Sequence, residues 1–136
     1  MKRYASAVWN GTGKEGNGTL STESDAFSNL PYTFRSRFED EPKTNPEELV
    51  AAAHAGCFNM KLAFVLGAAG FTPTHLDTTC HITLEDGAIS ASALTLKATI
   101  EGIDQAAFET AVKEAKENCP ISKLYNTTIT VDATLN

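Results

Sequence analysis

The sequence lacks the features that nucleic-acid binding, attachment to anionic membranes and export require. It carries 11 lysines and arginines against 17 aspartates and glutamates, and its formal net charge is −6. Proteins bind nucleic acids and anionic membranes through basic patches, so neither is an expected partner. The N-terminus, MKRYASAVWNG, lacks the apolar run of about 7–15 residues that a signal peptide contains. We therefore expect a cytoplasmic protein.

Cysteine is scarce, and its spacing argues against two common uses. The three cysteines, Cys57, Cys80 and Cys119, are an odd number in a chain without an export signal, which argues against a structural disulfide framework. Together with the three histidines they show no CxxC or HxxxH spacing, so we expect no metal site and no other cofactor. Each thiol is therefore either a small buried hydrophobe or a reactive group.

The most apolar segment spans residues 45–70 and reads NPEELVAAAHAGCFNMKLAFVLGAAG. Asn45 is a good N-cap, Pro46 suits the first helical position, and Glu48 stands where a capping box needs it. The glycines near its end provide a stop. These signals predict one long helix.

This predicted helix carries one cysteine, Cys57, in its middle turns. Five residues recur every three or four positions and form one stripe: Leu49, Ala53, Cys57, Met60 and Phe64. Because the opposite side is barely polar, we expect a sheet or a partner chain to cover the helix on most sides. A membrane span is not expected, because the stretch is rich in alanine and glycine and carries His54 and Lys61 mid-way.

The rest of the chain contains strand patterns and one further amphipathic helix. Strands are predicted at 4–9, 19–23, 32–39, 76–84, 89–100 and 127–135, a helix at 105–117, and a short helical turn at 120–123. Neighbouring strands carry hairpin signals rather than βαβ alternation. This pattern indicates a single α+β domain over residues 1–136, built in two layers.

To act as a nucleophile, Cys57 needs a cation. Only the thiolate reacts, and an unperturbed thiol, with a pKa of about 8.5, is only a few per cent ionised near neutrality. Cys57 lies about three turns inside its helix, beyond the reach of the helix dipole, and burial raises the pKa of a thiol. Arg35 and Arg37, on one face of the predicted strand 32–39, are the candidate cations, and the pattern does not choose between them. Glu47 is the candidate carboxylate that fixes the planar fork of such an arginine.

Cys119 is the candidate second thiol of a redox couple. It stands directly before Pro120, at the cap of the short helical turn, where a thiolate would gain from the helix dipole. A sulfenic acid on one cysteine condenses with a nearby thiol to a disulfide, so a peroxide-reducing site needs such a partner. The sequence leaves open whether Cys57 and Cys119 meet.

Two other interpretations of the thiols stay open. His54, one turn before Cys57, is a candidate general base for a thiol hydrolase or transferase, although packing or hydrogen bonding explains it as well. Alternatively, the fold serves as a non-catalytic small-molecule binding module with inert buried thiols. Cys80 has no obvious cationic neighbour and is interpreted as structural filler.

Six segments carry a family pattern: STES (21–24), RFED (37–40), TNPEELVAAAHAGCF (44–58), GFTPT (70–74), EGID (101–104) and CPISK (119–123). Together they resemble the OsmC branch of the OsmC/Ohr family of bacterial thiol peroxidases. The resemblance implies an OsmC-like fold of antiparallel sheets wrapped around a long buried central helix, in an intertwined homodimer. It also implies reduction of organic hydroperoxides, with recycling by a dithiol reductant such as protein-bound lipoamide. The chain departs from the family pattern in two places: Gly56 stands before the cysteine, where alanine is commoner in the family, and Cys80 is an extra cysteine.

By position, the resemblance assigns roles to four residues. Cys57 matches the peroxidatic cysteine and Cys119 the resolving cysteine, which together would form a disulfide after oxidation. Arg37, rather than Arg35, matches the activating arginine. Glu47 matches the glutamate that orients this arginine.

Overall fold

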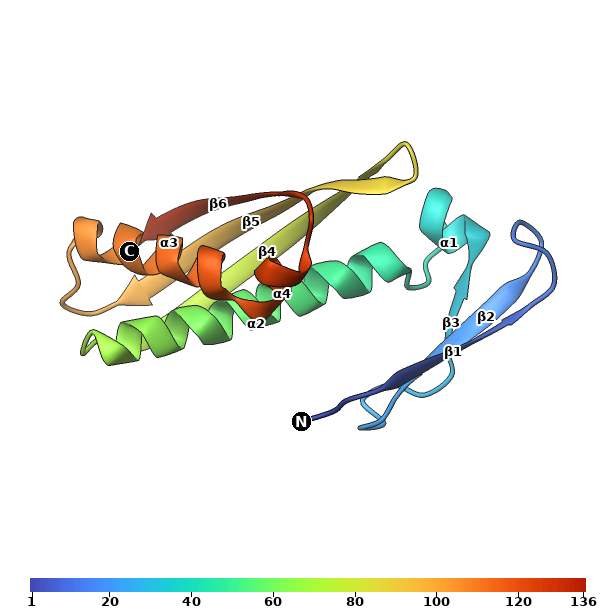
Figure 1. Ribbon diagram of the computed structural model, residues 1–136, viewed down its shortest axis with the longest axis horizontal. Coiled ribbons are helices and arrows are strands. Elements are labelled where there is room, and N and C mark those ends of the chain that lie inside the picture. The colour runs from blue at the N-terminus through green and yellow to red at the C-terminus, as the bar shows by residue number, and fades with distance from the viewer. The chain divides into compact units, whose positions relative to one another are not determined.

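The computed structural model describes residues 1–136, and the chain divides into two units, Met1–Leu49 and Val50–Asn136 (Figure 1). Each unit combines strands with helices, and the chain as a whole shows no regular βαβ repeat, so the predicted α+β class is confirmed. That the whole chain forms one domain stays a prediction.

The N-terminal unit holds a three-stranded antiparallel sheet in the order β1-β2-β3. Its strands are β1 (Ala5–Asn10), β2 (Asn17–Thr22) and β3 (Leu30–Thr33). The hairpin between β1 and β2 was expected from the sequence, and Gly11 in its turn has a φ of +92°, which glycine adopts freely. The rings of Trp9 and Tyr32 lie 5.2 Å apart beside Gly18. A Cβ on Gly18 would come within 2.6 Å of the Tyr32 ring, so the ring pair requires glycine there.

The third predicted strand is wrong beyond Thr33. Residues Phe34–Phe38 form a short helix, α1, in place of the rest of that strand. The cause is local. The Thr33 hydroxyl accepts the N–H of Ser36 at 3.1 Å and the Ser36 hydroxyl accepts the N–H of Thr33 at 2.9 Å, a capping box that outweighs the alternating pattern. Arg35 and Arg37 therefore lie on a helix rather than on one face of a strand.

The long helix is α2 (Pro46–Ala68), and its predicted start and stop are confirmed. The Asn45 side chain accepts a backbone N–H of the first turn at 2.8 Å, as an N-cap does. At the other end, Gly70 has a φ of +86°, and the N–H of Phe71 reaches the carbonyl oxygen of Leu66 at 2.9 Å. The left-handed backbone conformation of Gly70 lets following N–H groups bond carbonyl groups that the end of a helix otherwise leaves without a partner.

The second unit holds a sheet in the order β4-β5-β6. Its strands are β4 (Pro73–Glu85), β5 (Ala88–Ile100) and β6 (Thr128–Leu135). β4 and β5 form the predicted antiparallel hairpin, but β6 pairs with β5 in parallel, so this sheet is mixed rather than antiparallel throughout as expected. A parallel neighbour needs a crossover of about a dozen residues or more. Here α3 (Gln105–Asn118) and α4 (Pro120–Leu124) form that crossover.

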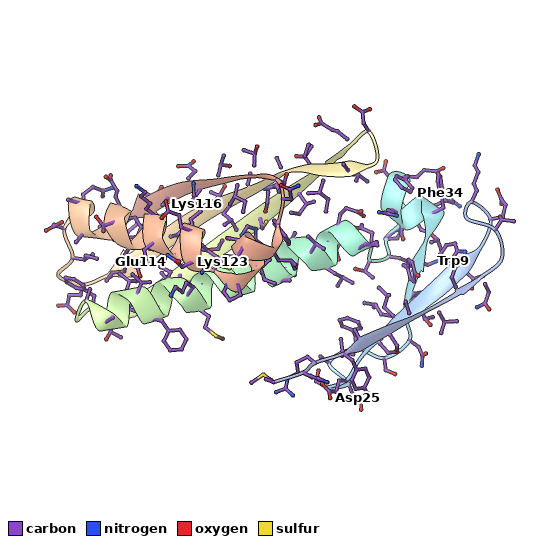
Figure 2. All side chains as sticks on the ribbon, viewed as in Figure 1. Trp9, Asp25, Phe34, Glu114, Lys116 and Lys123 are labelled. Carbon is purple, nitrogen blue, oxygen red and sulfur yellow. The ribbon has the colours of Figure 1, made fainter.

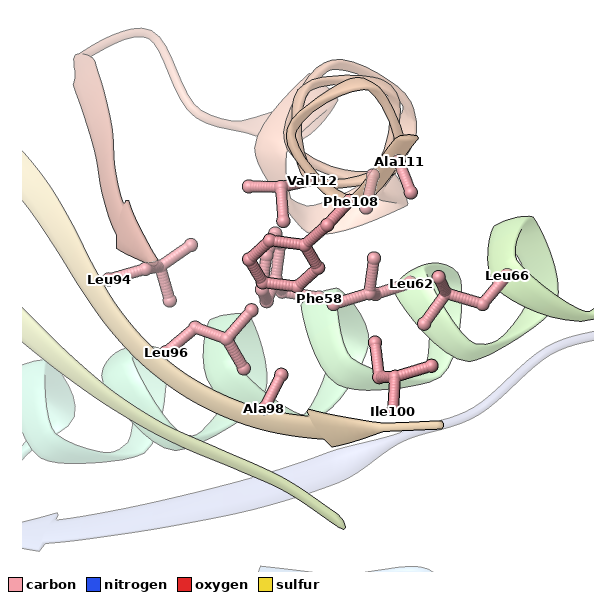
Figure 3. Close-up of a cluster of buried hydrophobic side chains, with 11 residues drawn as sticks. Phe58, Leu62, Leu66, Leu94, Leu96, Ala98, Ile100, Phe108, Ala111 and Val112 are labelled. Atoms are coloured by element: carbon pink, nitrogen blue, oxygen red, sulfur yellow. The ribbon is translucent and has the colours of Figure 1, made fainter. Parts of the chain in front are cut away.

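The hydrophobic core of the second unit lies between α2, α3 and β5 (Figure 3). Its buried side chains are Phe58, Leu62 and Leu66 from α2, Leu94, Leu96, Ala98 and Ile100 from β5, and Phe108, Ala111, Val112 and Ala115 from α3. The β5 residues alternate along the strand, so both helices cover the same face of the sheet and this unit has the predicted two layers. Of the two α3 residues labelled in Figure 2, Glu114 is exposed, whereas Lys116 is half-buried and lines a groove with Val131 and Ala133 of β6.

The buried side of α2 is not the stripe predicted from the sequence. His54, Phe58, Leu62 and Leu66 are buried, whereas Met60 and Phe64 of the predicted stripe are 65% and 71% exposed. Periodicity could not choose between these faces, because the helix is apolar almost all round. Within the second unit the helix is therefore covered on one face, and the face that carries Met60 and Phe64 is exposed.

By length and composition alone, α2 also fits a membrane span, a criterion that core helices of soluble proteins satisfy as well. The buried face of α2 packs in the core with α3 and β5, and His54 on that face hydrogen-bonds two serines of the same unit. Contacts of this kind are typical of a core helix. They support the expectation that α2 does not cross a membrane.

Candidate active site

Two cysteine thiols meet in the second unit. Cys57 lies in the middle of α2 and Cys119 at the junction of α3 and α4, 62 positions later, with the two Sγ atoms 2.7 Å apart. Both cysteines are free thiols, and the Cys119 thiol donates to the Cys57 sulfur. The contact that the sequence left open therefore brings a second thiol within reach of a sulfenic acid on the first.

Cys119 occupies a break between two helices. Its backbone N–H bonds the carbonyl oxygen of Ala115 at 2.9 Å and ends α3, while Pro120 begins α4. Proline cannot continue α3 because it lacks an N–H, but it suits the first position of a new helix. The predicted cap position is confirmed. The buried thiol, however, bonds Cys57 rather than the backbone of α4.

A groove of about 530 Å³ opens over Cys57. It is lined by Ala53, Gly56, Cys57, Met60, Lys61 and Phe64 of α2 and by Pro120 and Ile121 of α4. Most of these side chains are apolar, and Lys61 is the one cation among them. Gly56 leaves room in the groove, since a Cβ there would meet nothing within 4 Å. The groove thus offers a half-buried thiol to an apolar molecule.

Burial dominates the electrostatics of Cys57 within its own unit. It raises the pKa of the Cys57 thiol, and the hydrogen bond with Cys119 acts in the same direction. The backbone N–H of Ile121, at the start of α4, lowers this pKa but does not outweigh burial. These influences favour the neutral thiol, so a reactive Cys57 needs a cation brought to it.

The N-terminal unit brings Arg37 and Glu47 together. The Nε of Arg37 donates to both carboxylate oxygens of Glu47 at 3.1 Å, and Nη2 donates to Oε1 at 2.6 Å. This hydrogen bonding raises the pKa of Arg37 and keeps its charge. Arg35 instead pairs with Glu39 at 3.2 Å, with both side chains largely exposed. The two arginines that the sequence could not separate therefore differ in partner and in burial.

The four predicted residues thus form two pairs, each inside one unit. Cys57 lies against Cys119 in the second unit, and Arg37 lies against Glu47 in the first. That the two pairs form one site stays a prediction. No group of three or more His, Cys, Asp and Glu side chains is arranged to hold a metal ion.

His54 has a hydrogen-bond partner at each ring nitrogen. Its Nδ1 lies 2.6 Å from the hydroxyl of Ser92 on β5, and its Nε2 lies 2.8 Å from the hydroxyl of Ser122 on α4. Burial lowers the pKa of His54, so the ring is neutral at pH 7. Because both nitrogens are occupied, the arrangement disfavours His54 as a base for Cys57.

Three residues around His54 were missed in the sequence. Ser92 and Ser122 are polar residues inside a strand and a helix, where pattern alone assigns them to the surface, and Tyr125 follows α4. The Tyr125 ring packs edge-on against His54 at 4.9 Å. Cys80 bonds the Ser92 hydroxyl at 3.3 Å, and burial raises its pKa, so this third thiol belongs to the same polar cluster. The sequence held one indication of these residues, because Ser122 lies inside the family segment CPISK.

Comparisons with known proteins identify the family. The model of the OsmC-like protein family matches residues 38–134. The chain is 46% identical to Peroxiredoxin OsmC of Escherichia coli (strain K12) over 136 residues, covering 97% of this chain and 95% of that protein. It is 36% identical to an Organic hydroperoxide resistance protein-like sequence of Staphylococcus aureus (strain USA300) over 101 residues, covering 71% of this chain and 72% of that protein.

Solved structures share the fold. An OsmC-like protein from Mycoplasma pneumoniae matches with a TM-score of 0.78 at 14% identity, covering 99% of this chain and 97% of that one. An organic hydroperoxide resistance protein OsmC from Legionella pneumophila matches with a TM-score of 0.69 at 24% identity, covering 100% and 97%. Fold, family model and sequence identity agree, and the chain belongs to the OsmC-like protein family.

Proposed function

We propose that this protein is a thiol-dependent peroxidase that reduces organic hydroperoxides to alcohols. The observation that carries the proposal is the 2.7 Å contact between Cys57 and Cys119 beside an apolar groove. Relatives named Peroxiredoxin OsmC and Organic hydroperoxide resistance protein-like support this class of reaction.

The proposed reaction has three steps. The Cys57 thiolate attacks the distal oxygen of the peroxide, the O–O bond breaks, and the alkoxide takes a proton and leaves as alcohol while Cys57 becomes a sulfenic acid. The Cys119 sulfur then attacks the Cys57 sulfur, so that an S–S bond forms, the S–O bond breaks and water leaves. A dithiol reductant, of which protein-bound lipoamide is one example, reduces the disulfide by exchange and is itself oxidised.

Arg37 is the proposed source of the charge that Cys57 lacks. A guanidinium beside the thiolate would lower the pKa that burial raises, and it would also stabilise the charge that develops on the leaving oxygen. Three donor–acceptor contacts with Glu47 support this assignment, because they fix the orientation of the fork and preserve its charge. Arg35, exposed beside Glu39, lacks that support.

The groove supports alkyl hydroperoxides as the substrate class. Its lining is mainly apolar, with Met60 and Phe64 from α2 and Ile121 from α4 around the half-buried Cys57. Burial of a substrate's alkyl group against such a surface favours binding, whereas hydrogen peroxide has no alkyl group to bury. We therefore expect a higher kcat/KM for bulky alkyl hydroperoxides than for hydrogen peroxide.

A homodimer is part of this proposal. The exposed Met60 and Phe64 on one long helix face support a second copy as its cover. Mixing Arg37→Ala chains with Cys57→Ser chains tests whether each site draws on both copies. Random pairing then regains about a quarter of the wild-type activity, because half of the dimers hold one complete site. No recovery in mixed dimers, or a monomer in solution, contradicts a shared site.

Thiol titration tests the peroxidase proposal. One equivalent of cumene hydroperoxide should remove two thiols per chain from the wild type and from the matched control Cys80→Ser. It should remove none from Cys57→Ser, and Cys119→Ser should keep a sulfenic acid that dimedone traps. A thiol hydrolase or a binding module would lose no thiol to the peroxide, and that result in the wild type refutes the proposal.

A further inference from the structure

The buried imidazole of His54 joins three elements around the thiol pair. His54 belongs to α2, and its partners Ser92 and Ser122 belong to β5 and α4. The three residues are 0%, 0% and 8% exposed. In the neutral ring one nitrogen donates to its serine and the other accepts from its serine hydroxyl, so both ring positions are satisfied. Because α4 starts directly after Cys119, the bond to Ser122 links the segment that carries the second thiol to the helix that carries the first.

A second contact fixes the same segment. The Tyr125 hydroxyl donates to the carbonyl oxygen of Val50 at 2.9 Å, and its ring packs against His54. Val50 and His54 are neighbours one turn apart on α2. The helix α4 is only five residues long, and so short a helix is not stable by itself. Its position, and with it that of Cys119, therefore depends on these contacts with α2.

We propose that His54 is a positioning residue that holds Ser122, and through α4 keeps the Cys119 thiol in contact with Cys57. The inference rests on the proposed peroxidase function and extends it to a residue that does not touch the peroxide. By keeping Cys119 close to Cys57, His54 would increase the rate at which Cys119 reacts with the sulfenic acid of Cys57.

The sulfenic acid has two competing fates. Attack by the Cys119 sulfur gives the disulfide and releases water. Attack by Cys57 sulfur on a second hydroperoxide transfers another oxygen, giving a sulfinic acid and one more alcohol. The ratio of the two products depends on the effective concentration of Cys119 at Cys57. Loss of one anchoring hydrogen bond should lower that concentration roughly three- to tenfold.

Ser122→Ala and Ser92→Ala form a matched pair for the test. Each removes one buried hydroxyl from the same imidazole, but only Ser122 lies on α4. Ser122→Ala should slow disulfide formation roughly three- to tenfold and raise the sulfinic fraction of Cys57 at a fixed excess of cumene hydroperoxide, as read by mass spectrometry. Ser92→Ala should change both much less, and Ser122→Thr should restore them. The first oxidation step, followed in the Cys119→Ser background, should stay unchanged.

A second readout does not depend on peroxidase activity. In glutathione redox buffers, Ser122→Ala should lower the equilibrium constant for the Cys57–Cys119 disulfide by a similar factor. Tyr125→Phe, which loses only the bond to Val50, should act in the same direction and replaces Ser122→Ala if that variant does not fold. The positioning role is overturned if Ser122→Ala and Tyr125→Phe both keep the wild-type values of the two readouts. It is also overturned if Ser92→Ala changes them as much as Ser122→Ala does. Failure of the wild type to react with peroxide would refute the proposed function alone.

Discussion

Replacing Arg37 with alanine tests how Cys57 becomes reactive. Burial raises the pKa of the Cys57 thiol within its own unit, whereas Glu47 orients Arg37 and keeps it charged. A cation within about 4–6 Å lowers the pKa of an acidic group by about 1–3 units. Arg37→Ala should therefore raise the Cys57 pKa by about 1–3 units.

The expected loss of rate depends on pH. At a pH below both pKa values, each unit costs a tenfold loss of thiolate, so the second-order rate constant with cumene hydroperoxide should fall about 10- to 1000-fold. Because the pKa rises, the rate of the variant should climb over a more alkaline window, and the deficit should shrink as the pH passes the raised pKa. The deficit that persists above it measures the stabilisation of charge on the leaving oxygen.

Stopped-flow measurement of the loss of Cys57 thiol over a range of pH provides the assay. Arg35→Ala is the matched control, because Arg35 lies on the same short helix and pairs with Glu39 on the surface. Lys61→Ala is the second control, because Lys61 is the cation in the lining of the groove. An unchanged pH profile in Arg37→Ala, or a shift in Lys61→Ala of the size predicted for Arg37→Ala, would refute Arg37 as the activating cation.

Three further predictions concern stability and the groove. Gly56→Ala and Gly67→Ala should each stabilise α2 by about 0.5–1 kcal/mol in urea unfolding, since neither added Cβ meets an atom within 4 Å. Only Gly56→Ala should raise KM for bulky hydroperoxides, and an equal change of KM in Gly67→Ala would contradict the assignment of Gly56 to the groove. Ser36→Ala should lower the free energy of unfolding by about 1–3 kcal/mol, because it breaks the hydrogen bonds of the Ser36 hydroxyl with the Thr33 N–H and the Thr44 carbonyl oxygen. An unchanged free energy of unfolding would rule out the capping box as the cause of α1. Burial lowers the pKa of His54 in the folded state, so the free energy of unfolding should be highest above the unfolded pKa of about 6.5 and should fall as the pH drops toward the folded pKa. His54→Gln should lose less stability over this range. Parallel curves of unfolding free energy against pH for the wild type and His54→Gln would count against a neutral buried ring.

The ends of α2 were predictable because short-range hydrogen bonds determine them. Asn45 caps the first turn and Gly70 closes the last, and both signals are legible in consecutive residues. The same kind of local bonding misled the prediction at α1. There the alternating pattern predicts a strand, but Thr33 and Ser36 form a capping box within it that starts a helix.

Features that depend on distant contacts were not predictable from the residues alone. The buried face of α2 is chosen by what packs on it, because Phe58 and Phe64 are equally apolar. The meeting of Cys57 with Cys119 depends on the parallel crossover from β5 to β6, which strand patterns do not specify. The family resemblance implies this pairing. It did not indicate the serines that hold His54.

Peptide mapping under non-reducing conditions, after one equivalent of cumene hydroperoxide, tests the central claim most directly. We predict a cross-linked pair of peptides that joins Cys57 to Cys119, with Cys80 recovered as a free thiol. An oxidised protein without this cross-link, or with Cys80 in the bond, would contradict the proposed mechanism.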